Sequence, residues 1–163
     1  MALKNKVPQS VKEWKWNPDW TKDEEKKDVY RNDPIATAEL LYNIGWTLVP
    51  LYEMLLDGNF VMFSAMCTIK EMWDATNFAR LWTEAHNEEI DALLQEALGY
   101  FADAFFMIES LWAWEKMTKT GIIHIVQSLK LGLNLVRKSI NELDWYIYNL
   151  YHDEDELDGD ETS

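Results

Sequence analysis

Apolar residues recur at alternating spacings of four and three over the last third of the chain. The positions are Ile122, Val126, Leu129, Leu133, Val136, Ile140, Leu143, Ile147 and Leu150. This is the spacing of a heptad seam along one side of an α-helix, kept for four repeats. A single helix cannot bury a stripe of this length, so the pattern predicts that other helices cover it.

Two earlier segments show the same helical rhythm, one from Ile35 to Leu55 and one from Ile90 to Leu111. The segment between them opens with the apolar run Phe60–Phe63, which is typical of a helix covered on more than one side. Asp33 before Pro34, and Asn87 before two glutamates, are typical helix starts. We therefore predict helices over about 34–56, 60–86, 88–117 and 121–151.

These helices predict an all-α fold, an antiparallel four-helix bundle over residues 34–151. The link between the third and fourth helices is short, which makes them antiparallel neighbours. Residues 1–33 form an extended Trp-rich N-terminal arm, in which Thr21 and Glu24 have capping-box spacing for a short helix over about 22–30. Residues 152–163 form an acidic C-terminal tail that we expect to be disordered in isolation.

The chain is rich in aromatic residues, with nine Trp, seven Tyr and six Phe. A bundle core prefers aliphatic side chains, so some of these rings are expected to contact a partner. The arm could dock into grooves of its own bundle or of a neighbouring molecule. The residues that we expect to bind a partner are Trp14, Trp16 and Trp20 in the arm and Trp145, Tyr146, Tyr148 and Tyr151 near the end of the last helix.

Charge limits the classes of partner. The net charge is −14, and residues 152–163 hold seven acidic and no basic side chains. Phosphate binding needs a basic face, so direct nucleic-acid binding is not expected. The sign favours a basic protein surface as partner, which includes the case of a nucleic-acid mimic.

Other features bear on where the protein works. The single cysteine, Cys67, excludes an internal disulfide framework and fits a reducing compartment; its apolar neighbours predict a buried structural thiol. The longest uncharged apolar run, residues 40–52, is too short to span a bilayer. No secretory signal is visible. We expect a cytoplasmic protein, or a component of a particle assembled in the cytoplasm.

Motifs for catalysis are sparse. The sequence has no Glu-x-x-His pair, no Gly-x-Ser-x-Gly and no glycine-rich phosphate loop, so we predict no catalytic residue and no cofactor. One enzymatic pattern remains. Glu71 and Asp74 lie three residues apart on the second helix, and an antiparallel turn near Asn87 would bring Asp103 opposite Glu71.

This spacing resembles the all-α nucleotide pyrophosphohydrolases, which hold Mg²⁺ with Glu-x-x-Glu on one helix and Glu-x-x-Asp on the next. In this chain Asp74 replaces a glutamate and Tyr100 stands where the second helix of the family has one. The resemblance implies a magnesium cluster of Glu71, Asp74 and Asp103.

The main prediction is a non-enzymatic assembly protein, a self-assembling structural subunit of viral or particle type whose aromatic arm docks on a neighbour. The first alternative is an acidic inhibitor or immunity-type protein that covers a basic surface of its target. The second is a Mg²⁺-dependent nucleotide hydrolase.

Overall fold

The computed structural model describes residues 24–113 and 118–162, with the backbone alone for Ala113 and for residues 153–162. The regular elements in these residues are the helices α2 (Glu24–Asn32), α3 (Pro34–Asp57), α4 (Met62–His86), α5 (Glu88–Ala113) and α6 (Lys119–Thr162). The all-helical prediction is therefore confirmed for the described part of the chain.

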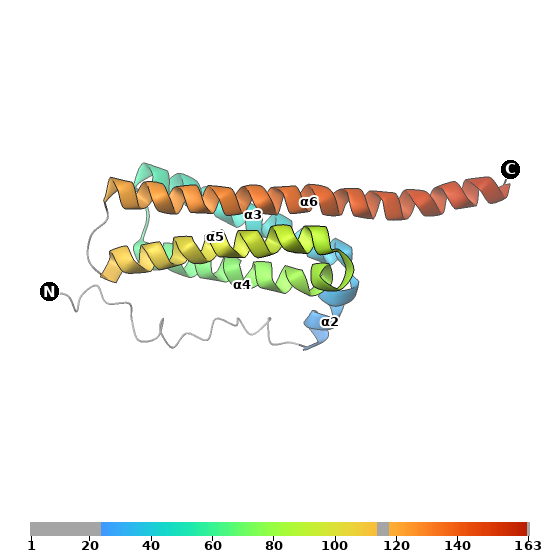
Figure 1. The fold of residues 1–163 in the computed structure, drawn as a ribbon, viewed down its shortest axis with the longest axis horizontal. Coiled ribbons are helices and arrows are strands. Elements are labelled where there is room, and N and C mark those ends of the chain that lie inside the picture. Colours follow the sequence, from blue (N-terminus) through green and yellow to red (C-terminus); the bar gives the residue numbers. More distant parts are fainter. Residues whose placement is uncertain (1–23, 114–117, 163) are drawn as a thin grey trace.

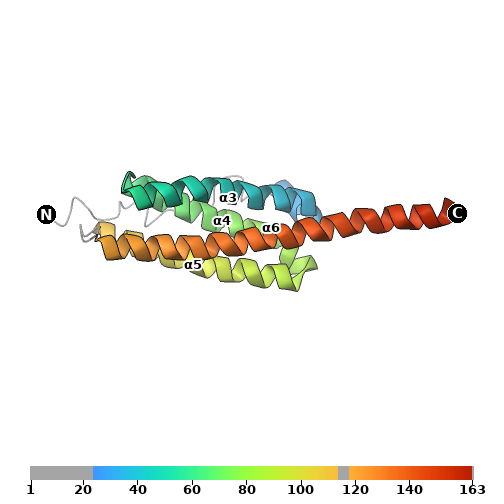
Figure 2. The same ribbon diagram turned by 90° about the horizontal axis from the view of Figure 1, so that it is seen from above.

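The four long helices lie side by side, and each runs opposite to the one before it in the chain (Figures 1 and 2). α5 packs against α4 and α6, and α3 packs against α6 and α4. The short helix α2 contacts α4 and α3 near the turn between α4 and α5. α6 continues well past the ends of the other long helices (Figure 1).

Local sequence explains where the helices begin. Asp33 caps α3 as its place before Pro34 predicts, accepting hydrogen bonds from the backbone N–H of Ile35 at 2.9 Å and of Ala36 at 3.2 Å. Asn87 separates α4 from α5 and accepts a bond from the N–H of Ile90 at 3.0 Å. α6 begins two residues earlier than predicted, at Lys119.

The predicted seam of α6 forms the centre of the packed helices. Its six members from Val126 to Leu143 are buried against the apolar residues of α3, α4 and α5. The helices approach closely at Gly132, where an added Cβ would lie 2.4 Å from Cε1 of Phe101. Only glycine leaves room there for the buried Phe101 ring, so this position sets how near α6 lies to α5.

An ion pair joins α4 to α5 beside their turn. Arg80 donates from Nε to Oδ1 of Asp91 at 2.9 Å and from Nη2 to Oδ2 at 3.1 Å. Thr83 and Gln95 donate to the same carboxylate at 2.8 Å and 2.7 Å. Burial raises the pKa of Asp91, but these hydrogen bonds outweigh it and hold the pKa below its usual value.

The end of α6 differs from the sequence-based expectation. We expected the helix to end near residue 151 and a disordered tail to follow, whereas the helical backbone continues to Thr162. The segment after Tyr151 contains no proline, and its glutamates and leucine are good helix formers, so nothing in it interrupts the backbone hydrogen bonds before Gly159. The first helix, described over Glu24–Asn32, continues two residues past its predicted end near residue 30, and residues 22 and 23 lie outside the described residues.

Candidate functional site

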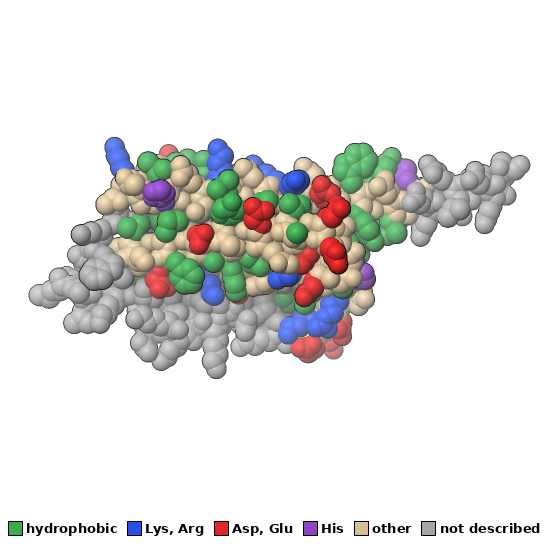
Figure 3. Space-filling model, viewed as in Figure 1, with side chains coloured by type: hydrophobic (Ala, Val, Ile, Leu, Met, Phe, Trp, Pro, Cys, Tyr) green, Lys and Arg blue, Asp and Glu red, His purple; other side chains and the backbone are tan. Residues whose placement is uncertain are grey.

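Exposed aromatic residues gather on α6 where it passes the ends of the other long helices. We call residues 145–151 the aromatic segment. The exposed fractions are 65% for Trp145, 36% for Tyr146, 50% for Tyr148, 45% for Leu150 and 51% for Tyr151. Figure 3 shows hydrophobic side chains gathered over this part of α6. Large rings exposed on consecutive helical turns are typical of a protein-binding surface.

Ring contacts order this segment. The Trp145 and Tyr148 rings meet edge to face with their centres 5.6 Å apart. The Tyr148 ring also stacks on His152, with ring centres 3.7 Å apart, and Nδ1 of His152 lies 3.0 Å from the Tyr148 carbonyl oxygen. These contacts restrict the rotamers of the exposed rings, which lowers the entropy cost of binding.

The base of the segment is fixed to the other helices through Tyr146. Its ring meets the buried ring of Trp82 on α4 edge to face, at 5.1 Å between centres. The Trp82 ring in turn stacks on His86, whose Nε2 lies 3.0 Å from the carbonyl oxygen of Arg31 on α2. α2, α4 and α6 thus meet at the point where the aromatic segment begins.

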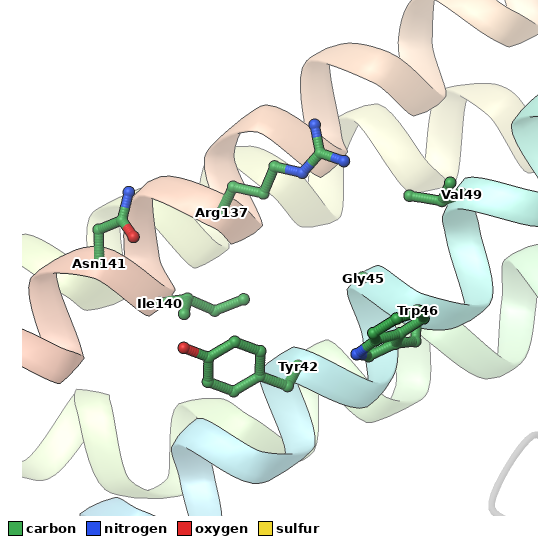
Figure 4. A pocket seen from close by; sticks show the side chains of 7 residues that line it. All are labelled: Tyr42, Gly45, Trp46, Val49, Arg137, Ile140 and Asn141. Carbon is green, nitrogen blue, oxygen red and sulfur yellow. The ribbon is translucent and has the colours of Figure 1, made fainter.

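A groove lies between α3 and α6, upstream of the aromatic segment (Figure 4). Its volume is about 430 Å³, and its lining residues are Tyr42, Gly45, Trp46, Val49, Arg137, Ile140 and Asn141. The Trp46 side chain is 77% exposed, the largest exposed fraction among the large hydrophobic residues that the structure describes. This groove is a second candidate binding surface. α6 contributes residues both to the groove and to the aromatic segment.

One hydrogen bond closes the end of the groove nearer to the aromatic segment. Tyr42 Oη donates to Oδ2 of Asp144 at 2.7 Å. This bond raises the pKa of Tyr42, because the tyrosine must keep its proton to donate it. The bond orients the Tyr42 ring across the space between α3 and α6.

The predicted partner-binding residues have different outcomes. Trp145, Tyr146, Tyr148 and Tyr151 are exposed together on α6, and their role in binding stays a prediction. Trp14, Trp16 and Trp20 lie outside the described residues. Sequence patterns missed the groove, although Trp46 gave a signal, since it lies off the apolar seam of α3 and directly after Gly45.

The implied magnesium cluster of Glu71, Asp74 and Asp103 is not assembled. Among the described residues, no group of three metal-binding side chains comes together. Asp103 lines a hollow between α5 and α6 with Phe106 and His124, whereas Asp74 is buried on α4. The reason is rotational: the side of α5 that carries Asp103 faces α6 and solvent, not α4.

Burial raises the pKa of two ionisable side chains on α4, Asp74 and Cys67. Oδ2 of Asp74 is buried and has no hydrogen-bond partner in the described part of the chain. Burial raises the pKa of Asp74 to about 6, against the opposing charge of Lys70 and with a smaller rise from nearby Glu71. Burial also raises the pKa of Cys67, which is half-buried, so its thiol keeps its proton and is a poor nucleophile.

No family model, curated protein or solved structure matched the chain in comparisons with known proteins. Among the described helices, none is both long and apolar enough to cross a membrane. The candidate function therefore rests on the surfaces themselves.

Proposed function

We propose that this protein is a non-enzymatic subunit that assembles with further copies of itself. In this proposal the four long helices form an antiparallel four-helix bundle, which acts as a rigid base. The aromatic segment of α6 is the contact surface. Its partner is a second copy of the chain, and the assembly is a structural one.

The exposure of the aromatic segment is the observation that supports the proposal. Trp145, Tyr148 and Tyr151 each leave at least half of their surface in solvent, next to a seam whose last core residue, Leu143, is completely buried. Tryptophan and tyrosine are the residues most enriched at the energetic centres of protein interfaces. The free energy of burying their hydrophobic area is gained only when another surface covers them.

One feature supports the alternative function, an acidic inhibitor or immunity-type protein that covers a basic surface of its target. α6 continues to Thr162, and its last part carries the seven acidic residues of 152–163 and no basic one. An acidic helix of this kind fits a basic protein surface. This alternative predicts a monomer whose binding to a basic partner is lost at high salt, since screening weakens exposed charge pairs.

Sedimentation equilibrium over a wide range of concentrations tests the proposal. We expect the weight-average mass of the wild-type protein to rise with concentration and that of the double variant Trp145→Ser, Tyr148→Ser to stay at the monomer value. Phe106→Ser is the matched control, because Phe106 on α5 is 61% exposed but lies away from the aromatic segment. A wild-type protein that is monomeric at every concentration would overturn the proposal.

A further inference from the structure

The groove between α3 and α6 is lined mainly by aromatic and aliphatic side chains. Arg137 is the only charged residue among those that line it. Lys138, the next residue of α6, is also exposed. The groove therefore combines an apolar floor with positive charge on its α6 side, which suits a helix that carries aromatic and acidic residues.

A second stripe on α6 links the groove to the aromatic segment. It consists of Arg137, Asn141, Asp144, Tyr148 and Tyr151, at spacings of four, three, four and three. Each member follows a residue of the core seam by one position, so the stripe runs beside the seam along the same helix. Its first half lines the groove, and its second half belongs to the aromatic segment.

We infer that the aromatic segment of one copy lies in the α3–α6 groove of a second copy, with the two α6 helices antiparallel. This inference rests on the proposed self-assembly and names the surface that accepts the segment. Two-fold symmetry makes the exchange reciprocal, so each copy gives its segment and receives the other. Two stripes with heptad spacing can pair side chain against side chain in this orientation.

The inferred register pairs the last four stripe positions of the two copies in antiparallel order. Asn141 of one copy then faces Tyr151 of the other, Asp144 faces Tyr148, and Arg137 lies opposite residue 155 of the acidic end. Asp144 accepts one bond from Tyr42, and its carboxylate can accept a further bond from the Tyr148 hydroxyl of the second copy. Trp46, with its exposed ring, lines the same groove one turn of α3 after Tyr42, where the incoming Tyr151 ring can pack on it.

Charge favours this occupant over the arm of the same chain. The incoming helix continues past Tyr151 into the acidic residues 152–163, which in this register lie along the part of α6 that carries Arg137 and Lys138. Residues 1–23 instead hold five lysines and three acidic residues. Arg137 attracts the first segment and repels the second.

Disulfide trapping tests the register. Asn141→Cys and Tyr151→Cys are introduced together with Cys67→Ser. Ten residues of helix separate the two positions by about 15 Å, whereas a disulfide needs Cα atoms within roughly 7 Å, so any bond must join two chains. We expect mild oxidation to yield a covalent dimer. The pair Glu142→Cys with Tyr151→Cys is the control, because residue 142 lies off the stripe, and it is expected to remain uncrosslinked.

Two groove variants test the same inference without cysteines. Arg137→Glu reverses the positive charge, and Trp46→Ala removes the exposed ring. Both residues are solvent-exposed, so the fold measured by circular dichroism should not change. We expect each variant to weaken association about tenfold or more in sedimentation equilibrium.

The outcomes separate the two proposals. A wild-type protein that never associates would overturn both. A wild-type protein that associates, combined with no trapped dimer and normal association of both groove variants, would leave self-assembly standing and overturn the groove as the accepting surface. Loss of association only on deletion of residues 1–23 would likewise overturn it, in favour of the arm.

Discussion

Two neighbouring stretches of α6 differ in how far their apolar residues are exposed to solvent. The seam residues from Val126 to Leu143 are at most 6% exposed, whereas the large side chains from Trp145 to Tyr151, apart from the half-buried Ile147, are 36–65% exposed. The helix is continuous through both. α3 and α5 lie beside the first stretch but do not reach as far as the second. Apolar residues of the first stretch therefore stabilise the fold, whereas those of the second remain available to a partner.

Truncation of a buried seam residue should give the largest effect on stability. Leu129 is fully buried, so Leu129→Ala should lower the free energy of unfolding by about 2–5 kcal/mol through lost burial and the cavity left behind. Urea unfolding followed by circular dichroism measures this. Leu131→Ala on the same helix is the control: Leu131 is 46% exposed, and the expected change is within about 0.5 kcal/mol. Equal losses in the two variants would contradict the assignment of the seam.

Close packing in the interior predicts the next effect. Gly132→Ala forces a methyl group against the Phe101 ring and should lower the free energy of unfolding by about 1–3 kcal/mol. Gly99→Ala on α5 is the matched control, because an added Cβ meets nothing within 4 Å there. That change should stabilise the protein by about 0.5–1 kcal/mol, since alanine favours the helix. Stabilisation by both substitutions would show that α5 and α6 are not this close.

Among the described residues, Asp74 holds the one buried side-chain oxygen that has no hydrogen-bond partner. Its pKa is raised from 3.8 to about 6, so the folded state binds the proton more tightly than the unfolded state does. Stability should therefore fall as pH rises between these values and stay level above about 6. Asp74→Asn should remove this fall, which is on the order of 3 kcal/mol, in thermal or urea unfolding. The exposed Asp103→Asn should keep it, and a pH profile unchanged in Asp74→Asn would refute the assignment.

The comparison also shows which features were readable from the sequence. The alternating spacings of the α6 seam and the caps at Asp33 and Asn87 determine the helices locally, so the all-helical class and the starts of α3 and α5 could be predicted. Exposure of Trp145 and Tyr148 could be anticipated because they lie off the seam. Periodicity in one chain, however, does not say how far a polar helix continues without packing, and the end of α6 was placed too early.

The groove and the failed magnesium cluster have a different cause. Whether Asp103 faces α4 or α6 depends on the rotation of α5 about its axis, which the packing of Phe101 against Gly132 determines. Whether Trp46 fills a gap or borders one depends on the distance between α3 and α6. Both are properties of helix pairs, and no single segment of sequence contains them.

Hydrogen–deuterium exchange at low and high protein concentration tests the central claim most directly. A helix end without packed neighbours opens easily, so amides of the aromatic segment should exchange quickly in the monomer, whereas amides between Ile125 and Leu143 should exchange slowly throughout. If a second copy covers the segment, exchange over 145–151 should slow markedly at high concentration. Fast exchange of these amides at every concentration would contradict the account.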